Sequence, residues 1–282
     1  MTTTRGAALV TGCSTGIGRA TALALHEAGL AVVATARRAE TLADLAALGI
    51  ETLALDVTSE ESMTEAVRAV EERHGHVSVL VNNAGYALQG PVEETAIEAV
   101  RDQFETNVVG LVRLTQLVLP GMRAAGAGRV VNIGSMGGRF TFPGGGFYHA
   151  SKHAVEAVSD ALRLEVAPFG VTVVLIQPGP VHSAFVDAAI ATLDTGAGPY
   201  AEFRGELAER YRQAYDGSGS NLEITPETVA AVVVRAATSS RPRARYAVGL
   251  MAKALITMRR LLPDAAWDGI IRRVWPTPQA PR

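Results

Sequence analysis

Short runs of aliphatic and β-branched residues recur along the first two thirds of the chain and predict the strands of a sheet. They occupy residues 7–11, 31–36, 77–82, 129–133 and 171–177. Most positions in each run are apolar, without strict polar alternation, which is typical of strands buried on both faces. Segments with helical spacing separate the runs, and strands joined by helices lie parallel because parallel neighbours need a crossover connection. The pattern predicts an α/β fold: a single Rossmann-type doubly wound parallel sheet with helices on both faces.

Start and stop signals delimit two of the helices between these strands. One helix is expected over residues 16–28, directly after the first strand. Thr58, with Glu61 three residues later, forms a capping box and predicts the start of a second helix, which Gly75 ends.

The pattern changes after residue 177. Proline and glycine break the chain at 178–180, and residues 185–222 carry scattered glycines and aromatics, which predicts a mobile flap over the substrate. Thr225 before Pro226 then predicts a helix start, because proline costs least at the first helical position.

Residues 250–275 carry more apolar side chains than an exposed tail would keep in water. We therefore expect this segment to cover the pocket or a subunit contact. Arginines at 259, 260, 272 and 273 leave a basic amphipathic segment on a membrane surface as the alternative. The expected organisation is one domain over residues 1–249, with the flap at about 182–222, and residues 250–282 as an extension of that domain.

Composition narrows the class of protein. The 282 residues are 48% hydrophobic and 19% charged, which predicts a folded chain rather than a disordered one. A net charge of −2 argues against sequence-independent nucleic-acid binding as the main activity. Cys13 is the single cysteine, so neither an internal disulfide nor a cysteine-built zinc cluster can form, and a reducing, cytoplasmic setting fits. No His, Asp and Glu cluster has metal-ligand spacing, and no apolar run reaches the roughly 18 residues of a membrane span, so neither a metal nor a span is expected.

The glycine-rich turn, residues 11–18 (Thr-Gly-Cys-Ser-Thr-Gly-Ile-Gly), joins the first strand to the first helix. Gly12 suits the tight turn, Gly16 lets the backbone approach a pyrophosphate, and Gly18 lets the helix pack closely on the sheet. The free N–H groups of the helix N-terminus attract an anion. Alone, the turn is a weak signal, since a strand-to-helix turn without a ligand has similar composition.

Tyr148 and Lys152 lie four residues apart in a predicted helix, so their side chains share one face. A phenol has a pKa of about 10, and a neighbouring ammonium lowers it toward the range useful for proton exchange near neutral pH. The chain has only two lysines and six tyrosines, which makes chance pairing at this spacing rare. Ser135 follows the strand at 129–133, at the carboxyl edge where such sheets bind ligands, and its hydroxyl suits a substrate oxygen. These residues predict proton transfer during interconversion of an alcohol and a carbonyl.

The T-G-x-x-x-G-x-G spacing of the glycine-rich turn resembles the short-chain dehydrogenase/reductase family. The resemblance continues in the family's order at Asp56-Val57, Asn82-Asn83-Ala84-Gly85, Asn107, Ser135, Tyr148-x-x-x-Lys152 and Pro178-Gly179. It covers most of residues 5–183. Further short motifs, among them Pro168-Phe169-Gly170-Val171 and Gly179-Pro180-Val181-His182 followed by Phe185, look like the 17β-hydroxysteroid and retinol dehydrogenase group. One departure is Ser183, which stands where the family has threonine and keeps a hydroxyl.

The resemblance implies a set of catalytic residues and a set of cofactor-binding residues. The catalytic residues are Asn107, Ser135, Tyr148 and Lys152, with Asn107 similar to the residue that holds a water between the lysine and solvent. The cofactor-binding residues are Gly12, Ser14, Thr15, Gly16, Ile17, Gly18, Arg37, Asp56, Val57, Asn83, Ala84, Gly85, Tyr148, Lys152, Pro178, Gly179, Val181 and Ser183. Purely structural roles stay open for Asn107, and turn or capping roles for Asp56 and Asn83.

The end of the second strand indicates which nicotinamide cofactor binds. A carboxylate there accepts from the adenosine 2′-hydroxyl of NAD, whereas arginine neutralises the 2′-phosphate of NADP. Ala36 stands where NAD-using family members carry aspartate, and Arg37 where NADP-using members carry a basic residue. NADP(H) is therefore expected over NAD(H), the alternative being that Arg37 is an ordinary surface charge.

The same branch resemblance implies a lipophilic small-molecule alcohol or carbonyl as substrate. A homodimer or homotetramer is also expected. Aromatic and Met residues flank the predicted site, although they equally suit a core: Met136, Phe140, Phe142, Phe147, Phe185, Tyr200, Phe203, Tyr211 and Tyr215. Glycines at 144–146 predict a pliable or open pocket wall. Two other functions stay open, a 3-oxoacyl or polyketide ketoreductase and a non-catalytic NADP-sensing regulator.

Overall fold

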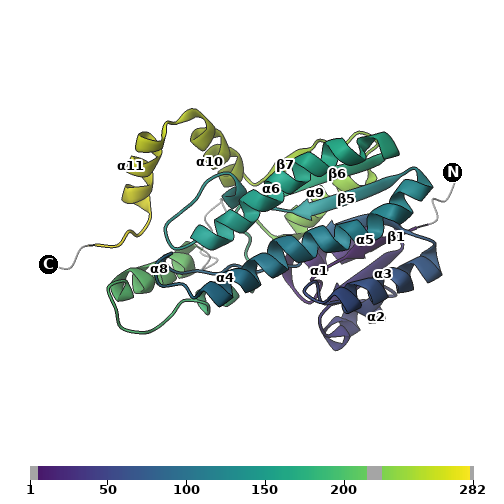
Figure 1. The fold of residues 1–282 in the computed structure, drawn as a ribbon, viewed down its shortest axis with the longest axis horizontal. Coiled ribbons are helices and arrows are strands. Elements are labelled where there is room, and N and C mark those ends of the chain that lie inside the picture. Colours follow the sequence, from purple (N-terminus) through teal and green to yellow (C-terminus); the bar gives the residue numbers. More distant parts are fainter. Residues whose placement is uncertain (1–5, 215–223, 280–282) are drawn as a thin grey trace.

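A seven-stranded parallel sheet forms the centre of the chain in the computed structural model, which describes residues 6–214 and 224–279 (Figure 1). Its strands, in spatial order, are β3 (Glu51–Ala54), β2 (Val32–Ala36), β1 (Ala7–Val10), β4 (Val77–Asn82), β5 (Gly128–Ile133), β6 (Val171–Pro178) and β7 (Arg245–Val248). Every neighbouring pair is parallel, and the order reverses between β1 and β4. The predicted doubly wound fold is confirmed.

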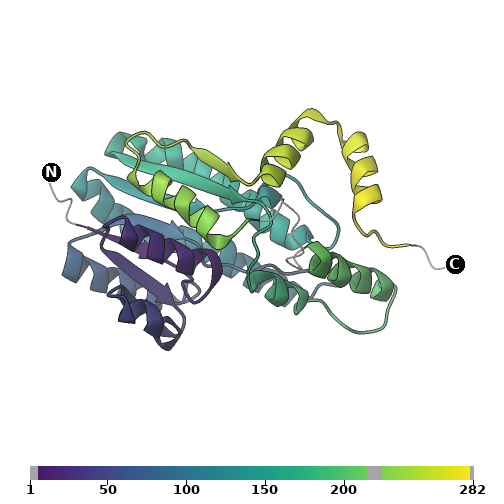
Figure 2. The ribbon, with the colours of Figure 1, turned by 180° about the vertical axis from the view of Figure 1, so that it is seen from behind.

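Helices cover both faces of the sheet, as Figures 1 and 2 show from opposite sides. One face carries α1 (Gly16–Glu27), α2 (Ala43–Ala47) and α9 (Pro226–Thr238), whose apolar side chains share one core cluster with strand residues. The other face carries α3 (Glu60–His74), α5 (Gly110–Ala125) and α6 (Gly146–Val166), which share the second cluster. Two cores on opposite faces explain why the strands are apolar at nearly every position.

Sequence patterns located the central strands within a residue or two but missed two edge strands. β3 has partly exposed residues, and β7 begins at Arg245 within a segment that carries arginines, so neither resembles a buried run. The capping box was misplaced by one residue: Ser59, not Thr58, caps α3 by accepting from the backbone N–H of Ser62. Thr58 instead donates its backbone N–H and its hydroxyl to Asp56. The predicted cap at Thr225 is confirmed, since its side chain accepts from the N–H of Thr228.

One helical stretch among the described residues, Ile97–Ala125, is long and apolar enough to span a membrane by length and composition. It comprises α4 (Ile97–Phe104), the π-helical turn η2 (Glu105–Val109) and α5. Leu114, Val118 and Met122 of α5 are buried in the core against the sheet and α3. This packing is that of a helix covering a sheet.

The flap and the tail extend beyond the carboxyl ends of the strands. The described part of the flap contains α7 (Phe185–Ile190) and α8 (Ala201–Ala214), while residues 215–223, including Tyr215, lie outside the described residues. The tail forms α10 (Leu250–Leu261) and α11 (Asp264–Val274), which project from the body of the molecule (Figures 1 and 2). Trp267 and Ile271 of α11 are buried against Phe140, as expected of an apolar tail, whereas Leu250 and Leu261 are exposed. The predicted mobility of the flap stays a prediction.

Candidate active site

A single cavity of about 1160 Å³ lies at the carboxyl ends of the strands and reaches from the glycine-rich turn to the tail. It lies where the strand order reverses, which is where doubly wound sheets bind ligands. All the sequence-predicted site residues line it except Gly18 and Asn107. The fold thus brings together residues from six strand ends and from the flap.

The glycine-rich turn has the geometry expected of an anion cradle. Gly12 and Gly16 adopt positive φ angles of 71° and 56°, a region that favours glycine. A Cβ on Gly18 would collide with the carbonyl oxygen of Gly12, so glycine is required there for the helix to pack. Thr15, the N-cap of α1, makes no side-chain cap hydrogen bond, and the first turn holds no acidic residue. The free N–H groups of α1 are therefore available to a phosphate oxygen.

Polar groups suited to a second phosphate gather beside the turn. Arg37, Ser14 and Thr15 are exposed and line the same cavity. Ala36, just before Arg37, is buried and leaves no carboxylate at this position to repel an anion. A guanidinium and two hydroxyls form a donor set that matches a phosphate better than a ribose hydroxyl.

Asp56 and Asn83 both have structural contacts as well as a place in the cavity wall. One carboxylate oxygen of Asp56 accepts from the backbone and hydroxyl of Thr58. The amide nitrogen of Asn83 donates to the carbonyl oxygens of Thr11 at 2.8 Å and Gly12 at 3.1 Å, which ties the end of β4 to the glycine-rich turn. The open alternative of a turn role therefore holds for both residues, without removing their remaining oxygens from the cavity.

Residues 178–183 close the cavity on the other side of the turn. The backbone N–H of Gly179 donates to Val248 of β7, and Val181 forms an isolated bridge with Ile224. These contacts hold Ser183 opposite the turn: a Cβ built on Gly16 would lie 3.5 Å from that of Ser183. The replacement of the family's threonine by serine leaves a hydroxyl facing the anion cradle.

Tyr148, Ser135 and Lys152 meet at the middle of the cavity. Burial raises the pKa of the Tyr148 phenol, and its hydrogen bond with Ser135 acts in the opposite direction. The Oγ of Ser135 also accepts from the N–H of Gly137 at 3.0 Å, which fixes its position. The Tyr148 and Ser135 hydroxyl groups are therefore hydrogen-bonded to each other at the cavity wall.

Lys152 does not act on the phenol in the way the sequence suggested. Its ammonium lies 5.9 Å from the centre of the Tyr148 ring and donates to the carbonyl of Ile133 at 2.9 Å. Burial lowers the pKa of Lys152 to about 8. The pKa of Tyr148 is raised, so the effect of burial on the phenol is larger than any lowering of its pKa by the Lys152 ammonium. The expected lowering of the phenol pKa by Lys152 is absent from this arrangement.

Asn107 lies behind this group, in the π-helical turn η2. Its amide nitrogen donates to the carbonyl of Tyr86 at 2.9 Å and to Ser151 at 3.1 Å, and its amide oxygen accepts from the N–H of Tyr86 at 3.1 Å. Ser151 in turn donates to the carbonyl of Tyr148 at 2.7 Å. The side chain thus connects η2 to the turn of α6 that carries Tyr148, which supports the structural role left open for it; the water-holding role stays a prediction.

The substrate end of the cavity, defined as the part lined by the flap and the tail, has mainly apolar walls. Of the aromatic and Met residues predicted there, four line it: Met136, Phe142, Phe185 and Tyr211. Phe140 and Phe203 are instead buried core residues, and the Tyr200 hydroxyl donates to Glu93. The tail, which was expected to cover the pocket or a subunit contact, contributes the following residues to the cavity wall: Met251, Leu255, Met258, Trp267, Ile270, Ile271, Val274 and Trp275.

Glycines 144–146 serve close packing rather than an open wall. A Cβ on Gly144 would collide with Leu207 of α8, and one on Gly145 would lie 2.7 Å from the ring of His149. Gly144 also has a positive φ of 81°. The expected open wall is wrong at Gly144 and Gly145, because Leu207 of the flap and His149 of α6 pack against them, whereas a pliable wall stays a prediction.

His149 is a site residue that sequence reasoning missed. Its Nδ1 lies 3.0 Å from the carbonyl oxygen of Gly137 and 2.9 Å from that of Phe140, so this nitrogen carries the proton. Burial lowers the pKa of His149 and keeps the ring neutral, which leaves Nε2 as an acceptor on a ring that lines the cavity. Its place directly after Tyr148 was the only sequence signal available.

Gln89 and Tyr211 add further hydrogen-bonding groups to the cavity wall. Both line the cavity, and the Tyr211 hydroxyl donates to the amide oxygen of Gln89 at 3.0 Å. The backbone N–H of Gln89 donates to Thr192, which joins the loop after β4 to the flap. A substrate with a second polar group therefore meets hydrogen-bonding partners beside Tyr148.

A family model described as "short chain dehydrogenase" matches residues 6–193. Two curated relatives are similar over most of the chain. The NADPH-dependent 3-dehydrocapnine reductase of Ornithobacterium rhinotracheale is 37% identical, over 93% of this chain and 95% of the relative. The human 17-beta-hydroxysteroid dehydrogenase type 1 is 38% identical, over 84% of this chain and 76% of the relative.

Solved structures show the same likeness. A short-chain dehydrogenase from Streptomyces avermitilis has a TM-score of 0.78 and 38% identity, covering 97% of this chain and 99% of that one. Two others were solved with cofactors. Serine dehydrogenase with NADP⁺ has a TM-score of 0.74 and 29% identity, covering 86% of this chain and 93% of that one. A short-chain dehydrogenase/reductase from Burkholderia phymatum with NAD has a TM-score of 0.78 and 25% identity, covering all of both chains. Similar proteins thus bind either dinucleotide.

Proposed function

The chain belongs to the short-chain dehydrogenase/reductase family, and from that premise we propose that it is an NADP(H)-dependent oxidoreductase that interconverts a ketone and a secondary alcohol on a lipophilic substrate. The observation that carries the proposal is the Tyr148–Ser135 pair in the middle of one cavity. The anion cradle and Arg37 lie at one end of it, and apolar tail residues lie at the other. We further propose the cytoplasm as its location and a homodimer or homotetramer as its assembly.

NADP(H) is supported by the residues present at the cofactor end. The free N–H groups of α1 receive the pyrophosphate, and Arg37 with Ser14 and Thr15 receives the 2′-phosphate. A bound nicotinamide supplies or accepts the hydride. No carboxylate stands at Ala36 to accept from the 2′-hydroxyl of NAD.

The proton is handled by the chain itself. The raised pKa of Tyr148 keeps the phenol protonated at neutral pH, so it donates to the developing alkoxide of a ketone substrate. Ser135 orients the substrate oxygen. The ammonium of Lys152 lies 5.9 Å from the centre of the Tyr148 ring, where its charge attracts the phenolate that forms as the proton leaves, although burial keeps the pKa of the resting phenol raised. At neutral pH the phenol is therefore in the protonated form that reduction of a ketone requires.

A lipophilic ketone is supported by the walls of the cavity and by the relatives. Residues of α10 and α11 close the substrate end with aromatic and aliphatic side chains. Two relatives are named as a 3-dehydrocapnine reductase and a 17-beta-hydroxysteroid dehydrogenase, and both names describe a reductase or dehydrogenase reaction. A 3-keto lipid or a steroid-like ketone is the class we propose.

A ketoreductase of acyl thioesters is the second candidate, and Arg210 favours it. This arginine lies over the Trp275 ring, 5.7 Å from its centre, and lines the cavity, where it suits the phosphate of a carrier. The non-catalytic regulator has less support, because Tyr148 and Lys152 are both in place.

Purified protein with NADPH or NADH and a panel of ketones tests the proposal. The panel contains 3-keto lipids, steroids, retinoids, aromatic ketones and 3-oxoacyl thioesters, and cofactor oxidation is followed by absorbance. We expect turnover with NADPH on lipophilic ketones. Turnover only on thioesters selects the second candidate, and NADPH binding without turnover on any class selects the regulator.

A further inference from the structure

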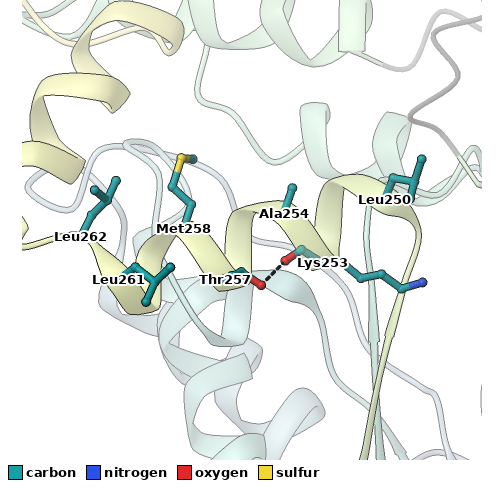
Figure 3. A pocket seen from close by; sticks show the side chains of 7 residues that line it. All are labelled: Leu250, Lys253, Ala254, Thr257, Met258, Leu261 and Leu262. Carbon is teal, nitrogen blue, oxygen red and sulfur yellow. Dashed lines mark hydrogen bonds between the residues drawn. The ribbon is translucent and has the colours of Figure 1, made fainter.

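The outward face of α10 is a surface that neither the catalytic group nor the cavity uses. Leu250 and Leu261 are 69% and 76% exposed at its two ends, and Lys253, Ala254 and Thr257 lie exposed between them. Figure 3 shows these side chains along one helix. The Thr257 hydroxyl donates back to the carbonyl of Lys253 at 2.7 Å, so it offers little polarity to the outside. Together with Arg260, these residues define the α10 outer face.

The opposite side of the same helix lines the substrate end of the cavity. Met251, Leu255 and Met258 all belong to its wall. Leu255 and Met258 pack with Phe140 and Trp267 in one apolar cluster. A single helix therefore separates the lipophilic cavity from whatever meets the α10 outer face.

Charge is distributed very unevenly along the chain. Residues 241–282 hold nine arginines and lysines and two aspartates, a formal charge of +7, whereas residues 1–240 hold 17 basic and 26 acidic residues, a formal charge of −9. α10 itself contains Lys253, Arg259 and Arg260 and no acidic residue. Lys253 and Arg260 make no ion pair within residues 6–214 and 224–279, whereas Arg259 pairs with Asp264. Such asymmetry is typical of chains that bind an anionic surface.

We propose that the α10 outer face docks on an anionic lipid surface. Two leucines flanking two cations match the chemistry of an interfacial helix, in which apolar side chains enter the headgroup boundary and basic ones meet lipid phosphates. A second copy of the chain fits less well, because pairing this face with itself opposes like charges. A nucleic acid would meet the cations but leave both leucines without an apolar partner.

Docking places the substrate end of the cavity next to the bilayer, with only α10 between them. A lipophilic ketone dissolved in the membrane then reaches Tyr148 without crossing water. This consequence rests on the proposed function, whereas the docking itself depends only on the tail. Vesicle binding and activity on a water-soluble ketone are therefore measured separately, so that the docking and the proposed function can each be contradicted without the other.

Co-sedimentation of the full chain with vesicles tests the proposal. One vesicle is phosphatidylcholine alone, and the other contains about a third phosphatidylglycerol. We expect binding to the anionic vesicle at least about tenfold stronger than to the neutral one, and weakened by 0.5 M salt, since attraction contributed by each basic residue is screened. The variant Lys253→Glu/Arg260→Glu should lose at least about tenfold in binding, and Leu250→Gln/Leu261→Gln several-fold, both with unchanged turnover of the water-soluble ketone.

Matched variants elsewhere on the surface control for net charge and hydrophobicity. Arg68→Glu/Arg101→Glu makes the same change in charge, and Leu48→Gln removes an exposed leucine far from the tail. Full binding by these controls supports the proposal. It is overturned by equal binding to both vesicles, by equal losses in the controls, or by a Leu250→Gln/Leu261→Gln variant that keeps its vesicle binding. If that variant instead splits an oligomer in sedimentation velocity, the face is a subunit contact and the proposal is wrong.

Discussion

The two ends of the cavity are held by different kinds of contact. At the cofactor end, the glycine-rich turn depends on backbone geometry: positive φ at Gly12 and Gly16, and the close approach at Gly18. At the substrate end, side chains from distant segments meet. Trp275 donates to the carbonyl of Pro143 at 3.0 Å and stacks on Phe142, with ring centres 4.7 Å apart.

This difference determines which substitutions each end of the cavity tolerates. A backbone cradle recognises phosphates through N–H groups and tolerates few substitutions, whereas a wall of side chains changes shape with single replacements while the sheet stays intact. We therefore expect mutations at the shared middle and at the cofactor end to affect all substrates alike. Mutations at the substrate end should discriminate among substrates.

The largest effect is expected at Tyr148, where the two ends meet. Tyr148→Phe removes the proton donor and should lower turnover at least about 10²-fold for every substrate, with NADPH affinity almost unchanged. Steady-state kinetics and NADPH fluorescence titration measure the two quantities. Tyr86→Phe removes another phenol from the same cavity wall and should cost far less. Similar losses in both variants would falsify the assignment.

The next effect belongs to the cofactor end alone. Arg37→Ala should weaken NADPH about tenfold or more and leave NADH nearly unchanged, because only NADPH carries the 2′-phosphate. Arg38→Ala is the matched control, since Arg38 is also exposed but does not line the cavity. Equal changes for NADPH and NADH would show that Arg37 is a surface charge. Adding Ala36→Asp to an Arg37→Ile variant should move the preference toward NADH.

Sequence patterns located the glycine-rich turn of the cofactor end because its backbone geometry is encoded locally. The turn at 11–18 needs glycines at fixed positions, and Tyr148 and Lys152 share one face of one helix, so spacing alone places them. Gly18 follows this logic in part: a Cβ there would collide with the carbonyl oxygen of Gly12, six residues away, but also with the side chain of the distant Asn83.

The tail was expected to cover the pocket or a subunit contact, but the contacts that shape the substrate end escaped prediction because they join residues far apart in the chain. The pairing of Trp275 with Pro143, or of Gln89 with Thr192, leaves no periodic signal in either segment. Glycines 144–146 were misinterpreted for this reason, as their neighbour Leu207 belongs to the flap. The pKa of Tyr148 was also misjudged, because burial depends on the whole fold whereas the Lys152 spacing is local.

A replacement at the substrate end should separate substrates by size. Trp275→Ala removes the ring that packs on Phe142 and Tyr211, and should raise KM about tenfold for bulky lipophilic ketones while sparing small ones.

Truncation after Gly249 removes the whole tail, and should raise the KM for bulky lipophilic ketones or disrupt assembly. Ending the chain after Trp275 is the control and should change neither constant. If the Gly249 truncation leaves kinetics, assembly and vesicle binding unchanged, the tail contributes to none of the three.

A smaller effect is expected from His149. His149→Asn keeps a donor near the Gly137 and Phe140 carbonyls but removes the Nε2 acceptor. We expect KM to rise about fivefold for ketones that carry a second hydrogen-bond donor, and no change for ketones without one. His153→Asn, one turn further along α6, is the control. Equal changes for both kinds of ketone would assign His149 a packing role only.

The smallest effect is on stability and comes from the buried ammonium of Lys152, between the cofactor end and the substrate end of the cavity. Burial lowers the pKa of Lys152 from 10.5 to about 8 in the folded chain, so the folded state holds this proton less tightly than the unfolded state. Below pH 8 both states carry the charge, and the folded state bears the full cost of burying it. Between pH 8 and 10.5 the folded chain loses the proton first, so this cost is relieved and stability rises with pH.

Lys152→Met removes this titration while keeping a side chain of similar length. Below pH 8 the variant should gain in stability relative to the wild type, apart from the lost hydrogen bond to Ile133. From pH 8 to 9.5 the wild type should recover about 3 °C in Tm relative to the variant, as measured by thermal unfolding. The comparison within this window avoids the raised pKa of Tyr148, which acts above pH 10 in the opposite direction. A constant difference in Tm would mean that Lys152 stays protonated throughout, and that the middle of the cavity is more polar than its burial implies.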